Sequence, residues 1–243
     1  MNFSIKKCAI NSTVIAFMSL SSLAYSFGSA DRHLVLEVGG FVNSQGKAQT
    51  ININELIGDY FSVTKRHKAQ ALVGLGYYID DMTNNNVHMS YGLHAFYLPS
   101  TTVKGDVTQE LMFTNLSYKY RVSHVPIYFV IKSTIAKPSA NYALILDAGI
   151  GPNIIMTRGF KEQSLDNITI PEQPFSSYTK SALSGMVGIG IKMNHIFRSA
   201  PVECGYRFFY LGRSYLPKNS DQVLNNLSTG NMYANALSCS VSL

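Results

Sequence analysis

The stretch Met89-Ser90-Tyr91-Gly92-Leu93-His94-Ala95-Phe96-Tyr97 decides the fold class, because it alternates between two kinds of side chain. One parity is apolar throughout, and the other mixes small, polar and aromatic residues: Met89, Tyr91, Leu93, Ala95 and Tyr97 oppose Ser90, Gly92, His94 and Phe96. Successive side chains of a strand point to opposite faces of the sheet. The alternation therefore predicts a β-strand with one apolar face and one mixed face.

The same alternation recurs along most of the chain, in segments at 33–42, 70–79, 115–122, 142–151, 187–194, 202–210 and 236–243. A further run, Val125–Ile135, carries Ile127, Phe129 and Ile131 on one parity. Segments of about ten residues suit a tilted crossing of a bilayer, which takes ~9–11 residues, better than the ~5–6 residues common in soluble sheets. Glycine and isolated charges on the weaker face, and Tyr near the ends of the runs, also favour a membrane barrel.

The composition supports this interpretation because charge is scarce while hydrophobicity is ordinary. Of the 243 residues, 46% are hydrophobic and 14% are charged, against roughly 25% charged in soluble domains. Such a chain is too apolar for disorder, and its polar residues are spread too evenly for a bundle of membrane helices. The net charge of +6 is mild and unclustered, apart from the short run at 65–68, so we expect no nucleic-acid partner.

The N-terminal segment has the layout of a secretory signal peptide. Lys6 and Lys7 precede an uncharged, largely apolar stretch from Ala9 to Leu23, which ends in small residues. We expect a signal peptide over residues 1–26, with cleavage before Phe27 or, alternatively, after Ala30. Residues 27–243 then form one outer-membrane β-barrel domain.

The predicted fold is an all-β, antiparallel, up-and-down transmembrane β-barrel. Eight strands are expected if Val125–Ile135 continues the preceding strand past Pro126, and ten if a short strand lies near Tyr60–Thr64. The connections at 80–86 and 195–200 are short, whereas polar stretches at 44–68, 99–110, 158–177 and 213–231 read as long extracellular loops. A soluble barrel or sandwich with its apolar face inward is the alternative architecture.

The chain also resembles the small OmpA-like members of the outer membrane β-barrel domain family of Gram-negative bacteria. The resemblance covers nearly all of residues 27–243 and rests on the order and spacing of several short motifs: Leu34 to Gly40, Val73 to Tyr77, Asn115 to Tyr120, Ala148 to Gly151, Val187 to Gly190 and Cys204 to Phe208. It implies a monomer in the cell outer membrane that is inserted by the outer-membrane insertion machinery and surrounded by lipid and lipopolysaccharide. Two features depart from the family pattern, because Leu243 replaces the terminal aromatic residue and the chain has no Trp.

A charge network is predicted inside the barrel. The residues that share the inward parity are Glu37, Lys119, Arg121, Asp147, Lys192, Glu203 and Arg207. A Lys or Arg on the lipid face costs about 2–4 kcal/mol at the midplane, so an inward network is the cheaper arrangement. We expect it to plug a narrow lumen, with a gated pathway as the alternative. Cys204 and Cys239 share the outward parity on neighbouring strands, where we expect free thiols, and a cross-strand disulfide is the alternative.

No enzyme is predicted. His88 and Ser90 resemble the His-x-Ser pair of lipid A deacylases, but no acidic or Asn context supports them, and the His and Cys spacings indicate no metal site or cofactor. The expected function is structural or surface-interactive, through long loops that meet host surfaces or lipopolysaccharide. A narrow pore for ions or small solutes is one alternative, and a soluble periplasmic or secreted ligand-binding barrel is the other.

Overall fold

A computed structural model describes residues 31–64, 69–84, 86–136, 141–197 and 200–243. The expected signal peptide, its cleavage site and the basic run at 65–68 lie outside these residues. The strands within them are β1 (Arg32–Ser44), β2 (Gln49–Ile51), β3 (Asp59–Phe61), β4 (Gln70–Asn84), β5 (Val87–Gln109), β6 (Phe113–Ala136), β7 (Tyr142–Ser164), β8 (Tyr178–Phe197), β9 (Ala200–Leu216) and β10 (Leu227–Ser242).

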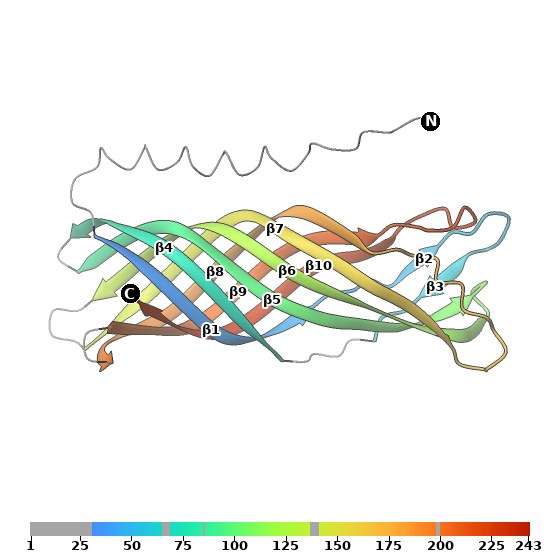
Figure 1. Cartoon of the computed structure of the whole chain (residues 1–243), viewed down its shortest axis with the longest axis horizontal. Coiled ribbons are helices and arrows are strands. Elements are labelled where there is room, and N and C mark those ends of the chain that lie inside the picture. Colours follow the sequence, from blue (N-terminus) through green and yellow to red (C-terminus); the bar gives the residue numbers. More distant parts are fainter. Residues whose placement is uncertain (1–30, 65–68, 85, 137–140, 198–199) are drawn as a thin grey trace, which may run out of the picture. The chain divides into compact units, whose positions relative to one another are not determined.

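Eight of these strands form a closed antiparallel ring, in the order β1, β4, β5, β6, β7, β8, β9, β10 and back to β1 (Figure 1). The first and last strands close it, with Val35 opposite Ser242 and Ser44 opposite Tyr233. The prediction of an eight-stranded up-and-down barrel is confirmed. As expected, residues 125–135 continue the strand that precedes them, since β6 runs unbroken through Pro126.

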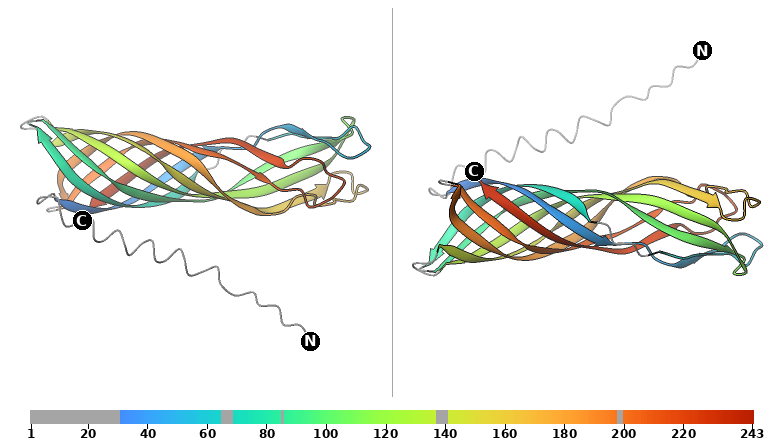
Figure 2. Two further views of the ribbon diagram at one scale, coloured as in Figure 1. Left: turned by 90° about the horizontal axis from the view of Figure 1, so that it is seen from above. Right: turned by 90° about the horizontal axis from the view of Figure 1, so that it is seen from below.

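The short strands β2 and β3 form a hairpin that continues the wall between β10 and β5 beyond the paired parts of β1 and β4. Tyr60 and Phe61 of β3 pair with Thr108 and Val107 of β5, and Gln49 of β2 is hydrogen-bonded to Ser228 of β10. The strand near Tyr60 therefore exists, but it lengthens the distal wall and is not a further member of the eight-stranded ring. The hairpin lies at the end of the barrel opposite the C-terminus (Figures 1 and 2). We call this end of the barrel distal.

The distal connections are shorter than the sequence indicated, because much of the polar sequence is strand. Residues 99–109 belong to β5, 158–164 to β7, and 213–216 and 227–231 to β9 and β10. The expectation of long loops over the whole of 99–110, 158–177 and 213–231 is therefore wrong. Polar residues in these stretches cover the outer face of strands that extend the barrel.

The proximal half of the barrel is the half that contains the C-terminus, and its exterior is apolar. Large side chains that point outward from every strand of the ring are 36–69% exposed, and we call this surface the apolar belt. Examples are Leu36, Val38, Leu75, Leu93, Phe129, Ile131, Leu146, Ile154, Val187, Ile189, Tyr206 and Leu237. Inward positions at the same level include buried charged side chains, such as Glu37, Lys132 and Arg207, beside buried aromatic ones. The proximal half is thus arranged inside out relative to a soluble protein.

The distal half has the opposite arrangement, and β6 shows the change within one strand. Its even-numbered residues face inward throughout, and they pass from Leu116, Tyr118 and Tyr120 in the distal half to Lys132 and Thr134 in the proximal half. Its odd-numbered residues face outward and pass from polar to apolar over the same length: Asn115, Ser117, Lys119, Arg121 and Ser123, then Val125, Ile127, Phe129 and Ile131. The distal barrel therefore has an ordinary hydrophobic core and a polar exterior.

This inversion corrects part of the predicted charge network. Lys119 and Arg121 face outward, whereas their neighbours Leu116, Tyr118 and Val122 are buried. The prediction placed the apolar parity toward lipid along the whole segment, which fails where the outer surface is polar. Apolar side chains there fill the interior, and the charged parity is turned outward.

The two cysteines are also corrected. Cys204 and Cys239 lie directly opposite each other on β9 and β10 and form a disulfide. The expectation of free thiols is wrong, since the register brings the two outward-facing residues together. Within the part of the chain that the structure describes, no helix has the length and apolar character to cross a membrane.

Candidate functional site

A buried ion-pair network fills the interior of the proximal barrel around Arg207. The Arg207 guanidinium donates from Nε and Nη2 to Asp147 Oδ2, at 3.1 and 2.8 Å, and from Nη1 to Ser238 Oγ at 2.9 Å. Nη1 also donates to Glu37 Oε1. The Glu37 and Asp147 side chains are 1% and 4% exposed. One cation thus holds two carboxylates from opposite walls, β1 and β7.

A second group of the network is centred on Glu203. Its Oε2 accepts from Lys132 Nζ at 2.7 Å, and Lys192 Nζ lies 3.8 Å from Oε1. Lys132 Nζ also lies 4.6 Å from the centre of the Tyr78 ring, in cation–π geometry. Together the two groups contain three acidic and three basic side chains, so the buried network balances in charge.

A glycine between two of the charged residues allows the network to form. Gly188 of β8 lies opposite Asp147 on one side and Arg207 on the other. A Cβ at this position would clash with Asp147 Oδ1 and lie 2.9 Å from Arg207 Cγ. The glycine therefore lets Arg207 reach across β8 to Asp147.

The structure brings together five of the seven residues predicted for the network: Glu37, Asp147, Lys192, Glu203 and Arg207. Lys119 and Arg121 belong to the outer wall of the distal barrel instead. The prediction missed Lys132 and His94. Lys132 has the parity opposite to Ile127, Phe129 and Ile131, which was a readable signal that it faces inward. His94 Nε2 lies 3.7 Å from Glu37 Oε2, and Tyr78 Oη lies 3.1 Å from His94 Nδ1.

An aromatic layer closes the interior above the network. Phe96 stacks on His94 with ring centres 4.1 Å apart and contacts Phe209 edge-on at 5.2 Å. Tyr128 completes the layer against Phe209 at 6.2 Å. These rings are at most 1% exposed. Side chains therefore occupy the cross-section of the barrel, as is usual for eight strands.

A second aromatic cluster forms the core of the distal barrel and ties the β2–β3 hairpin to it. Phe61 of β3 packs against Tyr118 and Phe175, and Phe160 packs against Phe175, with ring centres 5.1–5.8 Å apart. Tyr118 Oη donates to the Ser62 carbonyl at 2.6 Å. The hairpin and the segment that contains Phe175 thus each contribute an aromatic side chain to the distal core.

Glu162 is a buried acid in this distal region. Burial raises the pKa of the Glu162 carboxyl to about 7, while hydrogen bonds from the backbone of Glu172 and Gln173 lower it and the charge of Asp59 raises it further. The Gln173 side-chain amide is hydrogen-bonded to the backbone of Glu162. Its Nε2 donates to the Glu162 carbonyl and its Oε1 accepts from the Glu162 N–H, both at 3.1 Å. Glu162 therefore couples the stability of the distal barrel to pH.

Large apolar side chains are exposed on each of the four distal connections. Ile168 and Ile170, between β7 and β8, are 84% and 82% exposed. We call the complete set the apolar tips; it consists of Leu56, Ile57, Leu111, Met112, Phe113, Leu165, Ile168, Ile170 and Leu224. Large exposed apolar side chains that gather at one end of a molecule favour contacts with other molecules.

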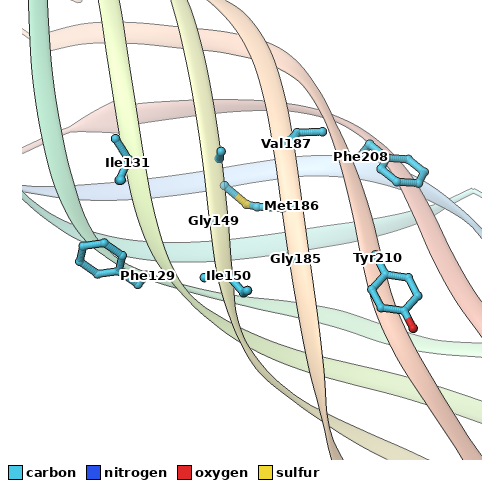
Figure 3. Close-up of a pocket in the computed structure, with 10 residues that line it drawn as sticks. Phe129, Ile131, Gly149, Ile150, Gly185, Met186, Val187, Phe208 and Tyr210 are labelled. Carbon is cyan, nitrogen blue, oxygen red and sulfur yellow. The ribbon is translucent and has the colours of Figure 1, made fainter.

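The apolar belt contains a shallow hollow of about 510 Å³ over β6 to β9 (Figure 3). Gly149 and Gly185 lie between the larger side chains of Phe129, Ile150 and Tyr210, which stand around them. The Tyr210 side chain is the one among the lining residues that carries a hydroxyl group. The hollow therefore offers space for an apolar chain.

The catalytic and metal-binding candidates of the sequence remain weak. Ser90 is buried inside the barrel, whereas His88 is exposed near the proximal end of β5. Among the residues that the structure describes, no group of three or more His, Cys, Asp or Glu could hold a metal ion.

Comparison with solved structures finds small outer-membrane barrels. Similar structures include OprG from Pseudomonas aeruginosa (11% identity, 89% of this chain and 98% of that chain, TM-score 0.48) and Neisserial surface protein A (9%, 88% and 98%, 0.42). The outer membrane protease OmpT from Escherichia coli is also similar (9%, 89% and 98%, 0.48). No family model and no curated protein matches the chain. These likenesses are too distant to carry information on activity or partners, and the resemblance to OmpA-like barrels stays a prediction.

Proposed function

We propose that the chain is a non-enzymatic, integral outer-membrane β-barrel that acts as a surface-interaction protein. The apolar belt supports insertion, because such a surface would be unfavourable in water and is what lipid chains contact. The polar exterior of the distal barrel supports its projection into water. The partners expected from the sequence, which are lipopolysaccharide, the insertion machinery and a host or surface ligand, belong to this proposal, as does the monomeric state.

The observation that carries the interaction role is the set of apolar tips. Ile168 and Ile170 are more than four-fifths exposed on a segment that Asp166 otherwise organises, since its Oδ1 accepts from the backbone N–H groups of Ile168 and Thr169 at 2.9 and 2.8 Å. A turn that is ordered by its own hydrogen bonds, yet presents large apolar side chains, favours contact with another surface. We therefore assign the contact to the distal tips.

Two experiments test this function. First, the unboiled protein should migrate differently from the boiled protein on gels and resist carbonate extraction; extraction into carbonate would leave the soluble ligand-binding barrel as the better description. Second, adherence of expressing bacteria to cultured host cells should fall severalfold in the variant Ile168→Asn/Ile170→Asn. Thr179→Asn, at an exposed position on β8, is the control. Unchanged adherence with an intact barrel would contradict the interaction role.

The closed interior supports a plug rather than a pore. Planar bilayer recordings should therefore show no conductance steps for the wild type. Discrete steps that change in the variant Glu203→Ala would instead support the narrow channel, because this substitution removes the acceptor that holds Lys132.

A further inference from the structure

Five basic side chains gather on the outer wall of the distal barrel. The register places Lys104 opposite Lys119 and Lys119 opposite Lys161, in one row across β5, β6 and β7. In the adjacent row, Arg121 lies opposite Arg158. We call Lys104, Lys119, Arg121, Arg158 and Lys161 the cationic patch. Neighbouring strands are about 4.8 Å apart, so the lysine row spans about 10 Å.

A bulge in β7 builds this arrangement. Residues three apart in a regular strand point to opposite faces, yet Arg158 and Lys161 both face outward. The extra residue lies at Gly159, which has a φ of 65° and coincides with the shift in register between β6 and β7. Arg121 Nη2 lies 3.4 Å from the place that a Cβ of Gly159 would occupy, so the guanidinium crosses over the glycine.

Like charges directly opposite each other destabilise a sheet. None of the five side chains forms a salt bridge with any described residue. The outward acid Asp106 lies in the row beyond the lysines, opposite Ser117. A bound anion would remove the repulsion that this arrangement otherwise carries.

The patch lies just beyond the apolar belt on the same strands. Arg158 is four residues from Ile154 of the belt, which is about 13 Å along the strand and about 10 Å along the barrel axis at the usual tilt. The headgroup layer of a bilayer is about 5–8 Å thick on each side. Long basic side chains can cover the remaining few ångströms. The patch is therefore at the level of lipid headgroups if the belt is in the hydrocarbon.

We propose that the cationic patch binds the phosphate groups of lipopolysaccharide in the outer leaflet. This inference rests on the proposed insertion into the outer membrane and assigns a site to the lipid partner. A multiply phosphorylated headgroup can meet both rows at once, since Arg121 and Arg158 offer forked donors and the lysines offer point charges. The apolar belt below accepts the acyl chains of the same molecule.

The test uses the protein folded in an uncharged detergent, with folding verified by the migration of unboiled samples. Purified lipopolysaccharide is titrated against the wild type and the variant Lys119→Gln/Arg121→Gln/Arg158→Gln. Each basic residue near an anionic lipid surface contributes about fivefold in affinity, so the variant should bind about 100-fold more weakly. Arg213→Gln, on the outward face of β9 away from the patch, should change binding by less than about twofold.

Two further arms identify the ligand. Dephosphorylated lipopolysaccharide should bind the wild type as weakly as intact lipopolysaccharide binds the triple variant. Inorganic phosphate at millimolar concentration should compete poorly, because it lacks the acyl chains that contact the belt; full displacement at concentrations matched to the lipid would overturn the lipid assignment. If the triple variant fails to fold, Lys119→Arg/Arg121→Lys/Arg158→Lys, which retains charge, should keep most of the affinity.

Binding by the folded triple variant within threefold of the wild type would overturn the proposal. So would equal affinity for the dephosphorylated lipid. Failure of the proposed function is separate, because it would appear as carbonate extraction or as unchanged adherence of the tip variant, and both measurements leave the cationic patch intact.

Discussion

The substitution Arg207→Met gives the sharpest test of the interior. Arg207 is the cation shared by Glu37 and Asp147, and its side chain is 9% exposed. Removing one partner of a buried ion pair costs about 3–5 kcal/mol, because the remaining charge stays buried without compensation. Here two carboxylates lose the same partner, so the free energy of unfolding should fall by about 5 kcal/mol, at the upper end of that range.

The companion variant Glu37→Gln/Asp147→Asn/Arg207→Met removes all three charges. It should recover most of the loss and remain within about 2 kcal/mol of the wild type, since neutral groups of similar size replace a buried triad at low cost. Lys192→Gln is the matched control. Lys192 is 30% exposed and 3.8 Å from Glu203, which keeps Lys132, so this change should cost less than about 1 kcal/mol.

The assay is urea unfolding of protein refolded into lipid vesicles, with the folded fraction read from the migration of unboiled samples on gels. The chain contains no Trp, so gel migration or circular dichroism replaces Trp fluorescence. An Arg207→Met variant within 1 kcal/mol of the wild type would refute the reasoning. A triple variant no more stable than the single one would also do so, because the penalty would then not arise from uncompensated charge.

Three further predictions concern other parts of the barrel. The pKa of Glu162 rises from 4.5 to about 7 on folding, so the folded state binds an extra proton between these pH values. The free energy of unfolding should therefore fall by up to about 3 kcal/mol as pH rises from 4.5 to 7. Urea midpoints measured at pH 5 and pH 8 should differ less in the variant Glu162→Gln than in the wild type. Thiol titration of denatured protein should find Cys204 and Cys239 oxidised, and Cys204→Ser/Cys239→Ser should lower the unfolding free energy by about 2–4 kcal/mol; two titratable thiols without reductant would contradict the pairing. Gly188→Ala should lower the free energy of unfolding by at least about 2 kcal/mol, because the added Cβ clashes with Asp147. Gly40→Ala is the control and should be tolerated, since a Cβ there has its nearest contact at 3.8 Å. Equal unfolding midpoints for the two variants would be inconsistent with the crowding at Gly188.

Period-two alternation predicts the strands well because burial and lipid contact both act on alternate side chains. The eight-stranded ring follows if residues 125–135 belong to the preceding strand, as they do in β6. The inward placement of Glu37, Asp147, Glu203 and Arg207 could be inferred in the same way, since their outward neighbours are apolar. Lys132 carries the same signal, because Ile131 beside it is apolar and faces outward.

Alternation does not reveal which solvent the apolar parity faces. Tyr118 and Phe129 both belong to β6, yet Tyr118 is buried in the distal core and Phe129 is 48% exposed on the belt. The outward side chains of this one strand change from polar to apolar along its length, but only the tertiary structure shows which side chains face outward. Bulges add to the difficulty, because the shift at Gly159 places Arg158 and Lys161 on the same face.

The change of exterior along β6 also limits how the barrel can sit in a bilayer. A shift of two residues toward the membrane would carry Arg121 about 5 Å closer to the hydrocarbon, at a cost that approaches 2–4 kcal/mol for each arginine at the midplane. A shift the other way would expose Val125 and its neighbours to water. The protein therefore has a preferred immersion depth, and a membrane of different thickness must adapt to the barrel by thinning or thickening around it.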